Sequence, residues 1–130
     1  MIVRLAQDRP AALAWLAGAA AFDCLGTGLG DPADLVDGQA LFELVCAGQV
    51  VGAFGLGVHD YADGRIVRCG AAAGAPGHDL LAAIVAFTET EARDRIGARL
   101  ITCETNRRGM VRKLQRQGFT VAGFILSKAM

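Results

Sequence analysis

The sequence has few residues of the kinds that bind metals or nucleic acid. It contains two histidines, His59 and His78, and four widely spaced cysteines without a Cys-x-x-Cys pair. Structural zinc sites need closely spaced cysteine and histidine ligands, so we expect no metal site. Thirteen basic residues balance thirteen acidic ones, and the formal net charge is zero. Because nonspecific nucleic-acid binding depends on a positive surface, we expect no nucleic-acid partner.

Long apolar runs are also missing. The apolar stretch over residues 11–22 is far shorter than the ~20 residues of a membrane helix, and Asp8, Arg9 and Pro10 precede it. We therefore expect no membrane span and a cytoplasmic location. The chain has 130 residues, of which 53% are hydrophobic, and this composition predicts a single domain over residues 1–130.

The N-terminal third indicates a helix and a loop. Pro10 is followed by an alanine-rich run, which favours a helix with proline in its first turn. Residues 24–38 are rich in glycine and aspartate and predict a loop, with a short helical turn over residues 32–36. Long loops often face a substrate.

Three strands are predicted next. Residues 41–47 and 49–58 are rich in residues that favour strands, and Gly48 between them suits a tight turn. A third strand over residues 65–72 follows the turn-forming residues 60–64. These segments predict an antiparallel meander, and the cysteines within strand-like runs are expected to be free thiols.

The C-terminal half indicates a strand–helix–strand unit. Apolar residues recur at helical spacing over residues 79–96, and Gly97 follows as a C-cap. A strand over residues 99–105 should then lie parallel to the strand over residues 65–72. After it, Asn106 can cap a helix.

That second helix is predicted over residues 107–117, with Gly118 ending it. A closing strand over residues 119–127 is expected to complete the sheet. The helix carries one basic side, which could contact a phosphate or simply face solvent, formed by Arg107, Arg108, Arg112, Lys113 and Arg116.

This order of elements resembles the GNAT (Gcn5-related N-acetyltransferase) superfamily. The best local match is residues 100–106, which run into a helix that ends in Gly118-Phe119. The resemblance implies an α/β fold with a mixed sheet, in which an antiparallel meander precedes a parallel β-α-β unit, a short helix and a closing strand. Small degenerate versions of this fold are encoded by phages.

The resemblance also implies an acetyl-CoA site. In that family the acyl-CoA enters between two parallel strands, and its diphosphate rests on backbone N–H groups at the start of the long helix. The corresponding turn here is residues 74–80. The implied cofactor-binding residues are Gly74, Gly77, His78, Asn106 and Arg107.

Three residues depart from the pattern of the family. Pro76 lacks an N–H group, and Asp79 places a negative charge where a diphosphate would bind. Leu114 stands four residues before Gly118-Phe119, where many members have a tyrosine that protonates the departing thiolate. The turn over residues 74–80 could therefore be only a connector between a strand and a helix.

Glu104 is the candidate catalytic base. It lies at the end of the predicted strand over residues 99–105 and could take a proton from a substrate amine. The alternative is a carboxylate at a strand end that pairs with Arg107 or Arg108. His59 and Asp60 could border a substrate cleft or lie in a solvated turn.

Two functions are therefore compatible with the sequence. One is acetyl transfer from acetyl-CoA to a small amine or a peptide amine by direct attack. The other is a non-catalytic GNAT-fold protein, such as an assembly component or a phage virion structural protein located in the virion. A small-molecule amine or a protein partner is expected, and a homo-oligomer is possible.

Overall fold

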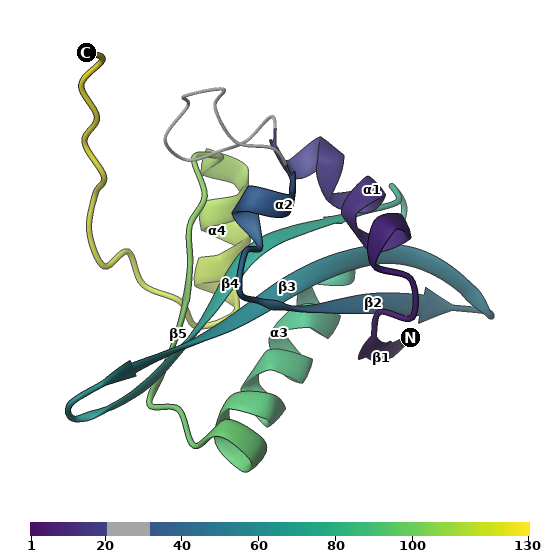
Figure 1. The fold of residues 1–130 in the computed structure, drawn as a ribbon, viewed down its shortest axis with the longest axis horizontal. Coiled ribbons are helices and arrows are strands. Elements are labelled where there is room, and N and C mark those ends of the chain that lie inside the picture. Colours follow the sequence, from purple (N-terminus) through teal and green to yellow (C-terminus); the bar gives the residue numbers. More distant parts are fainter. Residues whose placement is uncertain (21–31) are drawn as a thin grey trace.

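A mixed five-stranded sheet runs through the described part of the computed structural model, which covers residues 1–20 and 32–130. The strands follow the order β1-β2-β3-β4-β5 (Figure 1). Strands β1 to β4 pair antiparallel, and β5 joins β4 in parallel. This arrangement confirms the predicted meander and the parallel unit. The bounds are β1 (Ile2–Leu5), β2 (Ala40–Cys46), β3 (Gln49–Tyr61), β4 (Gly64–Gly74) and β5 (Leu100–Cys103).

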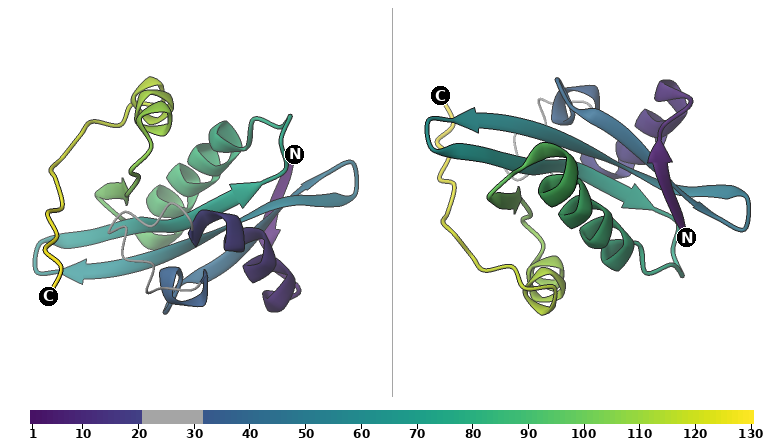
Figure 2. Two further views of the ribbon diagram at one scale, coloured as in Figure 1. Left: turned by 90° about the horizontal axis from the view of Figure 1, so that it is seen from above. Right: turned by 90° about the horizontal axis from the view of Figure 1, so that it is seen from below.

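Helices cover both faces of the sheet. Figure 2 shows α1 and α2 on one face and α3 on the other. A π-helical segment, η1, continues α3, and α4 follows β5. The predicted helices are therefore present. Their bounds are α1 (Arg9–Ala20), α2 (Pro32–Leu35), α3 (Leu80–Thr90), η1 (Glu91–Ile96) and α4 (Arg108–Arg116).

The tight turn between β2 and β3 forms at Ala47 and Gly48. Both residues have positive φ angles, 51° and 78°, as the two central residues of a type I′ hairpin turn require. The strand β3 then continues to Tyr61, and β4 begins at Gly64. The second turn is thus shorter than residues 60–64, because both strands extend into the predicted turn.

Three aromatic rings fix the α3 face of the sheet. The rings of Phe42 and Phe54 stack at 5.4 Å between centroids, and Phe87 of α3 lies 4.9 Å from Phe42 and 5.9 Å from Phe54. On the opposite face, Leu16 of α1 and Val36 are fully buried. Because the sheet is covered on both sides, its central strands are apolar on both faces.

The helix α3 begins and ends as its sequence predicts. The Asp79 carboxylate caps it by accepting a hydrogen bond from the Ala82 N–H at 3.5 Å. Ile84 and Val85 are buried against the sheet. At the other end Gly97 adopts the left-handed conformation with φ 72°, which a C-terminal glycine makes possible without strain.

The structure corrects two predictions for α4 and the segment that follows it. Asn106 is not its N-cap; Arg107 holds that position with an extended backbone, because the helix begins one residue later than expected. The segment over residues 119–127 is not a strand, since it forms no ladder with the described sheet. The helix α4 has an apolar side, on which Leu114 is buried and Met110 and Val111 are half-buried.

The strand β1 was not predicted. It has four residues, too few to show a period, and a tertiary ion pair stabilises it. The Arg4 Nε lies 2.6 Å from the Glu43 Oε1 on β2. The Glu43 side chain is 8% exposed, so its charge depends on this partner.

Removing Arg4 should therefore destabilise the fold. We expect Arg4→Met to lower the free energy of unfolding by about 1–3 kcal/mol, a reduced value because Arg4 is partly solvated. The double variant Arg4→Met/Glu43→Met should recover at least half of the loss, since no charge is left unpaired. Urea denaturation of the four proteins measures both effects. Additive losses in the double variant would contradict this account.

Candidate functional site

The strands β4 and β5 separate at one end of the sheet. They pair from Ile66 opposite Leu100 to Cys69 opposite Cys103, where β5 ends, and β4 continues to Gly74. The separation coincides with a β-bulge at Gly70. In the β3–β4 ladder, Gly55 pairs with Ala71 and Leu56 pairs with Cys69, which leaves Gly70 without a partner. A bulge of this kind bends a strand away from its neighbour.

A cleft of about 450 Å³ opens at this separation. Its floor is formed by residues 68–74 of β4, and α3, β5 and α4 supply its walls. The walls are mainly apolar, which suits an extended organic ligand rather than a solvated ion. The apolar wall residues include Ile84, Val85, Ile101, Met110, Leu114 and Phe119.

Glu104 lies at the rim of this cleft and pairs with Arg68. The Arg68 Nη2 is 3.2 Å from the Glu104 Oε1, with side chains 38% and 43% exposed. The partner of Glu104 is thus neither Arg107 nor Arg108, the two partners considered from the sequence. The pair holds the carboxylate at the end of β5, where it can meet a ligand in the cleft.

Two buried polar atoms beside the bulge lack hydrogen-bond partners among the described residues. They are the Nε of Arg68 and the Oε1 of Gln39. The Gln39 side chain lies against Gly55, Gly57 and Gly70, and a Cβ at Gly70 would collide with its amide group. Since buried polar atoms are normally satisfied and Arg68 lines the cleft, its Nε is a candidate for contact with a ligand, whereas Gln39 is not part of the cleft lining.

Neither residue was selected from the sequence. The position of the Gln39 side chain depends on Gly55, Gly57 and Gly70, which are distant from Gln39 in sequence. Two glycines within one strand, Gly55 and Gly57, were nevertheless a signal that another group approaches the backbone closely there. Arg68 could have been found as a charged residue in the interior of a mainly apolar strand.

Two thiols also line the cleft. Cys69 and Cys103 are direct partners across β4 and β5. Cys46 and Cys69 are free thiols, as predicted; Cys24 lies outside the described residues. Burial raises the pKa of the Cys69 thiol to about 12, and the nearby Cys103 adds to this shift. Cys69 is therefore a protonated thiol at neutral pH and a poor nucleophile.

The turn before α3 lies at one end of the cleft. Gly74 lines the cleft, and a Cβ there would collide with Leu80 and lie 2.8 Å from the Val51 carbonyl oxygen. Packing thus requires a glycine at this position. Gly77 has φ 86° and open space around it, and His78 is exposed. The Asp79 carboxylate occupies one helix N-terminal donor.

The structure brings only some of the predicted residues together. Gly74, Glu104 and Arg107 line the cleft. Gly77, His78 and Asn106 are exposed and are not part of its lining. Their proposed contacts with a cofactor stay predictions.

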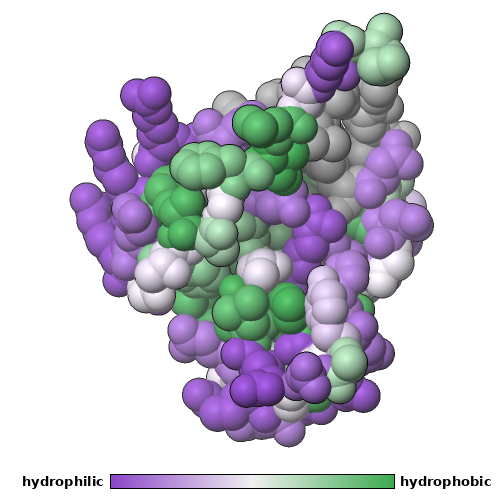
Figure 3. All heavy atoms as spheres, turned by 90° about the vertical axis from the view of Figure 1, so that its left-hand side faces the viewer, coloured by the Kyte–Doolittle hydropathy of each residue, from purple (hydrophilic) through white to green (hydrophobic). Residues whose placement is uncertain are grey.

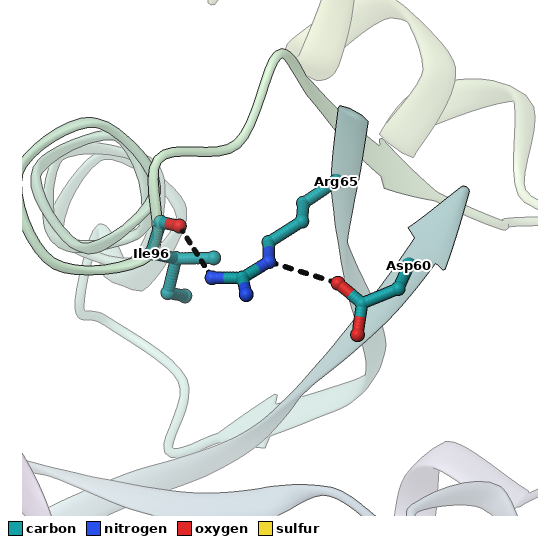
Figure 4. Close-up of polar contacts among 3 residues, drawn as sticks. All are labelled: Asp60, Arg65 and Ile96. Carbon is teal, nitrogen blue, oxygen red and sulfur yellow. Dashed lines mark hydrogen bonds and ion pairs between the residues drawn. The ribbon is translucent and has the colours of Figure 1, made fainter. Parts of the chain in front are cut away.

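His59 and Asp60 lie elsewhere, in the β3–β4 hairpin. Asp60 accepts a hydrogen bond from the Arg65 Nε at 2.8 Å, and the Arg65 Nη1 donates to the Ile96 carbonyl at 3.0 Å (Figure 4). Arg65 thereby joins the hairpin to the C-terminal end of η1, where a cation is favourable. Asp60 has a structural partner, and His59 is exposed; neither lines the cleft.

The described residues carry neither a metal cluster nor a membrane helix. Within residues 1–20 and 32–130, no group of three or more His, Cys, Asp or Glu side chains could hold a metal ion. No helix of the same residues is long and apolar enough to cross a membrane.

The fold is that of the GNAT acetyltransferases. No family model and no curated protein matches the sequence, but solved structures match the fold. A transcriptional regulator from Bacillus halodurans C-125 has a TM-score of 0.72 at 16% identity, covering 99% of both chains. A GNAT family acetyltransferase from Staphylococcus aureus has a TM-score of 0.61 at 17% identity, covering 99% of this chain and 98% of its own.

A third structure of the same fold was solved with a ligand. AAC(6')-Iy, in complex with the bisubstrate analog CoA-S-monomethyl-acetylneamine, has a TM-score of 0.64 at 18% identity, and the match covers 100% of this chain and 99% of that one. Identities this low show a shared fold and do not assign a substrate.

The raised pKa of Cys69 predicts a loss of stability in alkali. In the unfolded chain the thiol ionises at its ordinary pKa of 9.0, and in the fold its pKa is about 12. The contribution of this thiol to the free energy of unfolding is therefore constant below pH ~9 and falls as the pH rises from ~9 to ~12, by up to about 1.4 kcal/mol per pH unit. Denaturation of the wild type and Cys69→Ala at several alkaline pH values measures the difference. Parallel curves for the two proteins would contradict the burial of this thiol.

Proposed function

We propose that the chain is an acyl-CoA-dependent N-acyltransferase that transfers an acetyl group from acetyl-CoA to a small amine or a peptide amine. The observation that carries the proposal is the apolar cleft between β4 and β5, with the Glu104 carboxylate at its rim. The complex of AAC(6')-Iy with a CoA-linked bisubstrate analog supports it, because that protein shares the fold.

The cleft fits the pantetheine arm of acetyl-CoA. Beyond Cys69, β4 has no strand partner on its β5 side in the described chain, so this edge offers backbone N–H and C=O groups. The arm carries two amide groups and can pair with such an edge as an added strand would. The apolar walls then cover its hydrocarbon segments.

The diphosphate fits less well. The N-terminus of α3 supplies N–H donors and the positive end of the helix dipole. The Asp79 carboxylate competes there, since it accepts from the Ala82 N–H and carries the same charge sign as the ligand. Arg107 at the cleft offers a compensating positive charge.

The residues at the rim support direct attack. Bound acetyl-CoA supplies the acetyl group as an activated thioester. Arg68 orients the Glu104 carboxylate, which accepts the proton that the amine loses as its nitrogen bonds to the acyl carbon. Leu114 cannot donate a proton, so the thiolate released when the C–S bond breaks takes its proton from water.

Glu104→Gln tests the role of the carboxylate. We expect kcat/KM for acetylation to fall by about 100-fold or more, because a general base contributes on the order of 10²- to 10⁴-fold. The assay follows CoA thiol release with a panel of polyamines and peptides. Asp94→Asn is the matched control, since Asp94 is an exposed carboxylate that pairs with Arg93 and is not part of the cleft lining. Equal activity in both variants would remove Glu104 from the reaction.

Asp79→Asn tests the diphosphate site. Asparagine caps helices as well as aspartate does, so the substitution removes the charge and keeps the cap. At ~6 Å and an effective dielectric constant of ~20 to 80, the repulsion removed is about 1–3 kcal/mol, so CoA should bind more tightly, and less so at high salt. Gly77→Val should weaken binding, because a branched side chain blocks approach to the turn.

Calorimetry with acetyl-CoA measures these affinities and separates the two candidate functions. The competing candidate is a non-catalytic protein with the same fold, which the occupied N-cap at Asp79 and the apolar Leu114 favour. No binding heat at millimolar acetyl-CoA, or no response of folded protein to either substitution, would favour that candidate.

A further inference from the structure

The C-terminal segment, residues 119–130, leaves the molecule with its apolar side chains exposed. Phe124 and Leu126 are 91% and 93% exposed, and Val121 and Ile125 are more than half exposed. Figure 1 shows the segment extending from the end of α4 away from the sheet, and Figure 3 shows hydrophobic side chains gathered on the face that carries it. Four large apolar side chains so close together in water are unfavourable and indicate a missing contact.

The segment has the pattern of a strand that is buried on both faces. In an extended chain, Val121 and Ile125 lie on one face and Phe124 and Leu126 on the other. A strand in a sheet with one solvent-exposed face would have one polar side, whereas a strand in a sheet that is covered on both faces is apolar on both sides. The pattern therefore requires a sheet that is covered on both sides.

The sheet of this protein provides such a place beside β5. Among the described residues, the strand β5 is the last in the sheet order and one of its edges has no strand partner. Its Leu100 is 54% exposed, although helices cover the two faces of the sheet (Figure 2). A strand added beside β5 would cover Leu100 and extend the covered sheet.

The end of α4 directs the segment away from the β5 of its own chain. Gly118 has φ 92°, and the Phe119 N–H bonds to the Leu114 carbonyl while the Gly118 N–H bonds to the Gln115 carbonyl, both at 3.1 Å. This pair of bonds is a Schellman motif, which fixes the direction in which the chain leaves a helix. Both views of Figure 2 show the segment running clear of β5.

We propose that residues 119–127 pair with β5 of a second copy of this chain, and that the second copy does the same in return. A two-fold axis makes this contact twice, so each chain donates one strand and receives one. Phe119 lines the cleft, so the exchanged strand begins at the cleft wall. Because the formal net charge is zero, two copies do not repel each other through their net charge.

Light scattering during gel filtration tests the proposal at about 50 µM protein. The full chain should elute at twice its monomer mass. The double variant Phe124→Asp/Leu126→Asp should raise the dissociation constant at least 100-fold, while Lys128→Asp, a new aspartate just beyond the pairing segment, should leave the dimer intact. A monomeric wild type, or a charged double variant that remains dimeric, would overturn the proposal.

A mixing experiment identifies the surface that receives the strand. A chain lacking residues 119–130 keeps a receptive β5, and a full chain with Leu100→Asp keeps the donor segment. Each should be monomeric alone, and their mixture should form a 1:1 heterodimer. If Ile2→Asp on the other edge strand, β1, dissociates the wild-type dimer and Leu100→Asp does not, the segment binds β1 and the proposal is wrong. Should the truncated chain not unfold cooperatively, the comparison of Leu100→Asp with Ile2→Asp in the full chain decides alone.

Discussion

The cleft depends on one irregularity in the ladder between β3 and β4. The unpaired Gly70 bends β4 at the point where β5 stops, so the two strands part instead of closing the sheet. Without the bulge, β4 would stay beside β5 and leave no space for a ligand between the two strands. The same bulge also places Gly70 against the Gln39 side chain on the other face. One extra residue in one strand thus shapes both faces of the site.

A conflict between folding and binding is concentrated at the start of α3. The Asp79 carboxylate satisfies a backbone N–H that would otherwise have no partner, which stabilises the helix. The same N–H groups are the natural donors to an anionic ligand. A chain that keeps aspartate here gains a well-formed helix and accepts weaker anion binding.

Most of the fold could be predicted from the sequence, because its signals are local. The helix over residues 79–96 has a clear period, with a capping Asp79 and a terminating Gly97. The failures have non-local causes: β1 is held by the pair Arg4–Glu43, whose members are far apart in sequence. The segment over residues 119–127 has the composition of a strand, but composition does not specify which strand it pairs with.

The site was predicted less completely than the fold. Glu104 was found because a strand end positions it, and Gly74 because glycines mark turns. Arg68 and Gln39 were missed because their importance comes from unsatisfied atoms near a bulge, and a sequence does not show which hydrogen bonds are absent. No local rule assigns the partner of Glu104, since Arg68 belongs to a different strand.

The Arg65 bridge has a consequence for how the molecule opens. Its guanidinium holds Asp60 of the hairpin and the Ile96 carbonyl at the end of η1. The last turn of a helix normally frays independently, because its carbonyls have no fixed partner. Here fraying of that turn must also release the hairpin, so the two should exchange their amide hydrogens as one cooperative unit. The Arg65 bridge therefore holds the hairpin end of β4 to η1. The other end of the β4–β5 pair, where the two strands separate at the cleft, is the more flexible one.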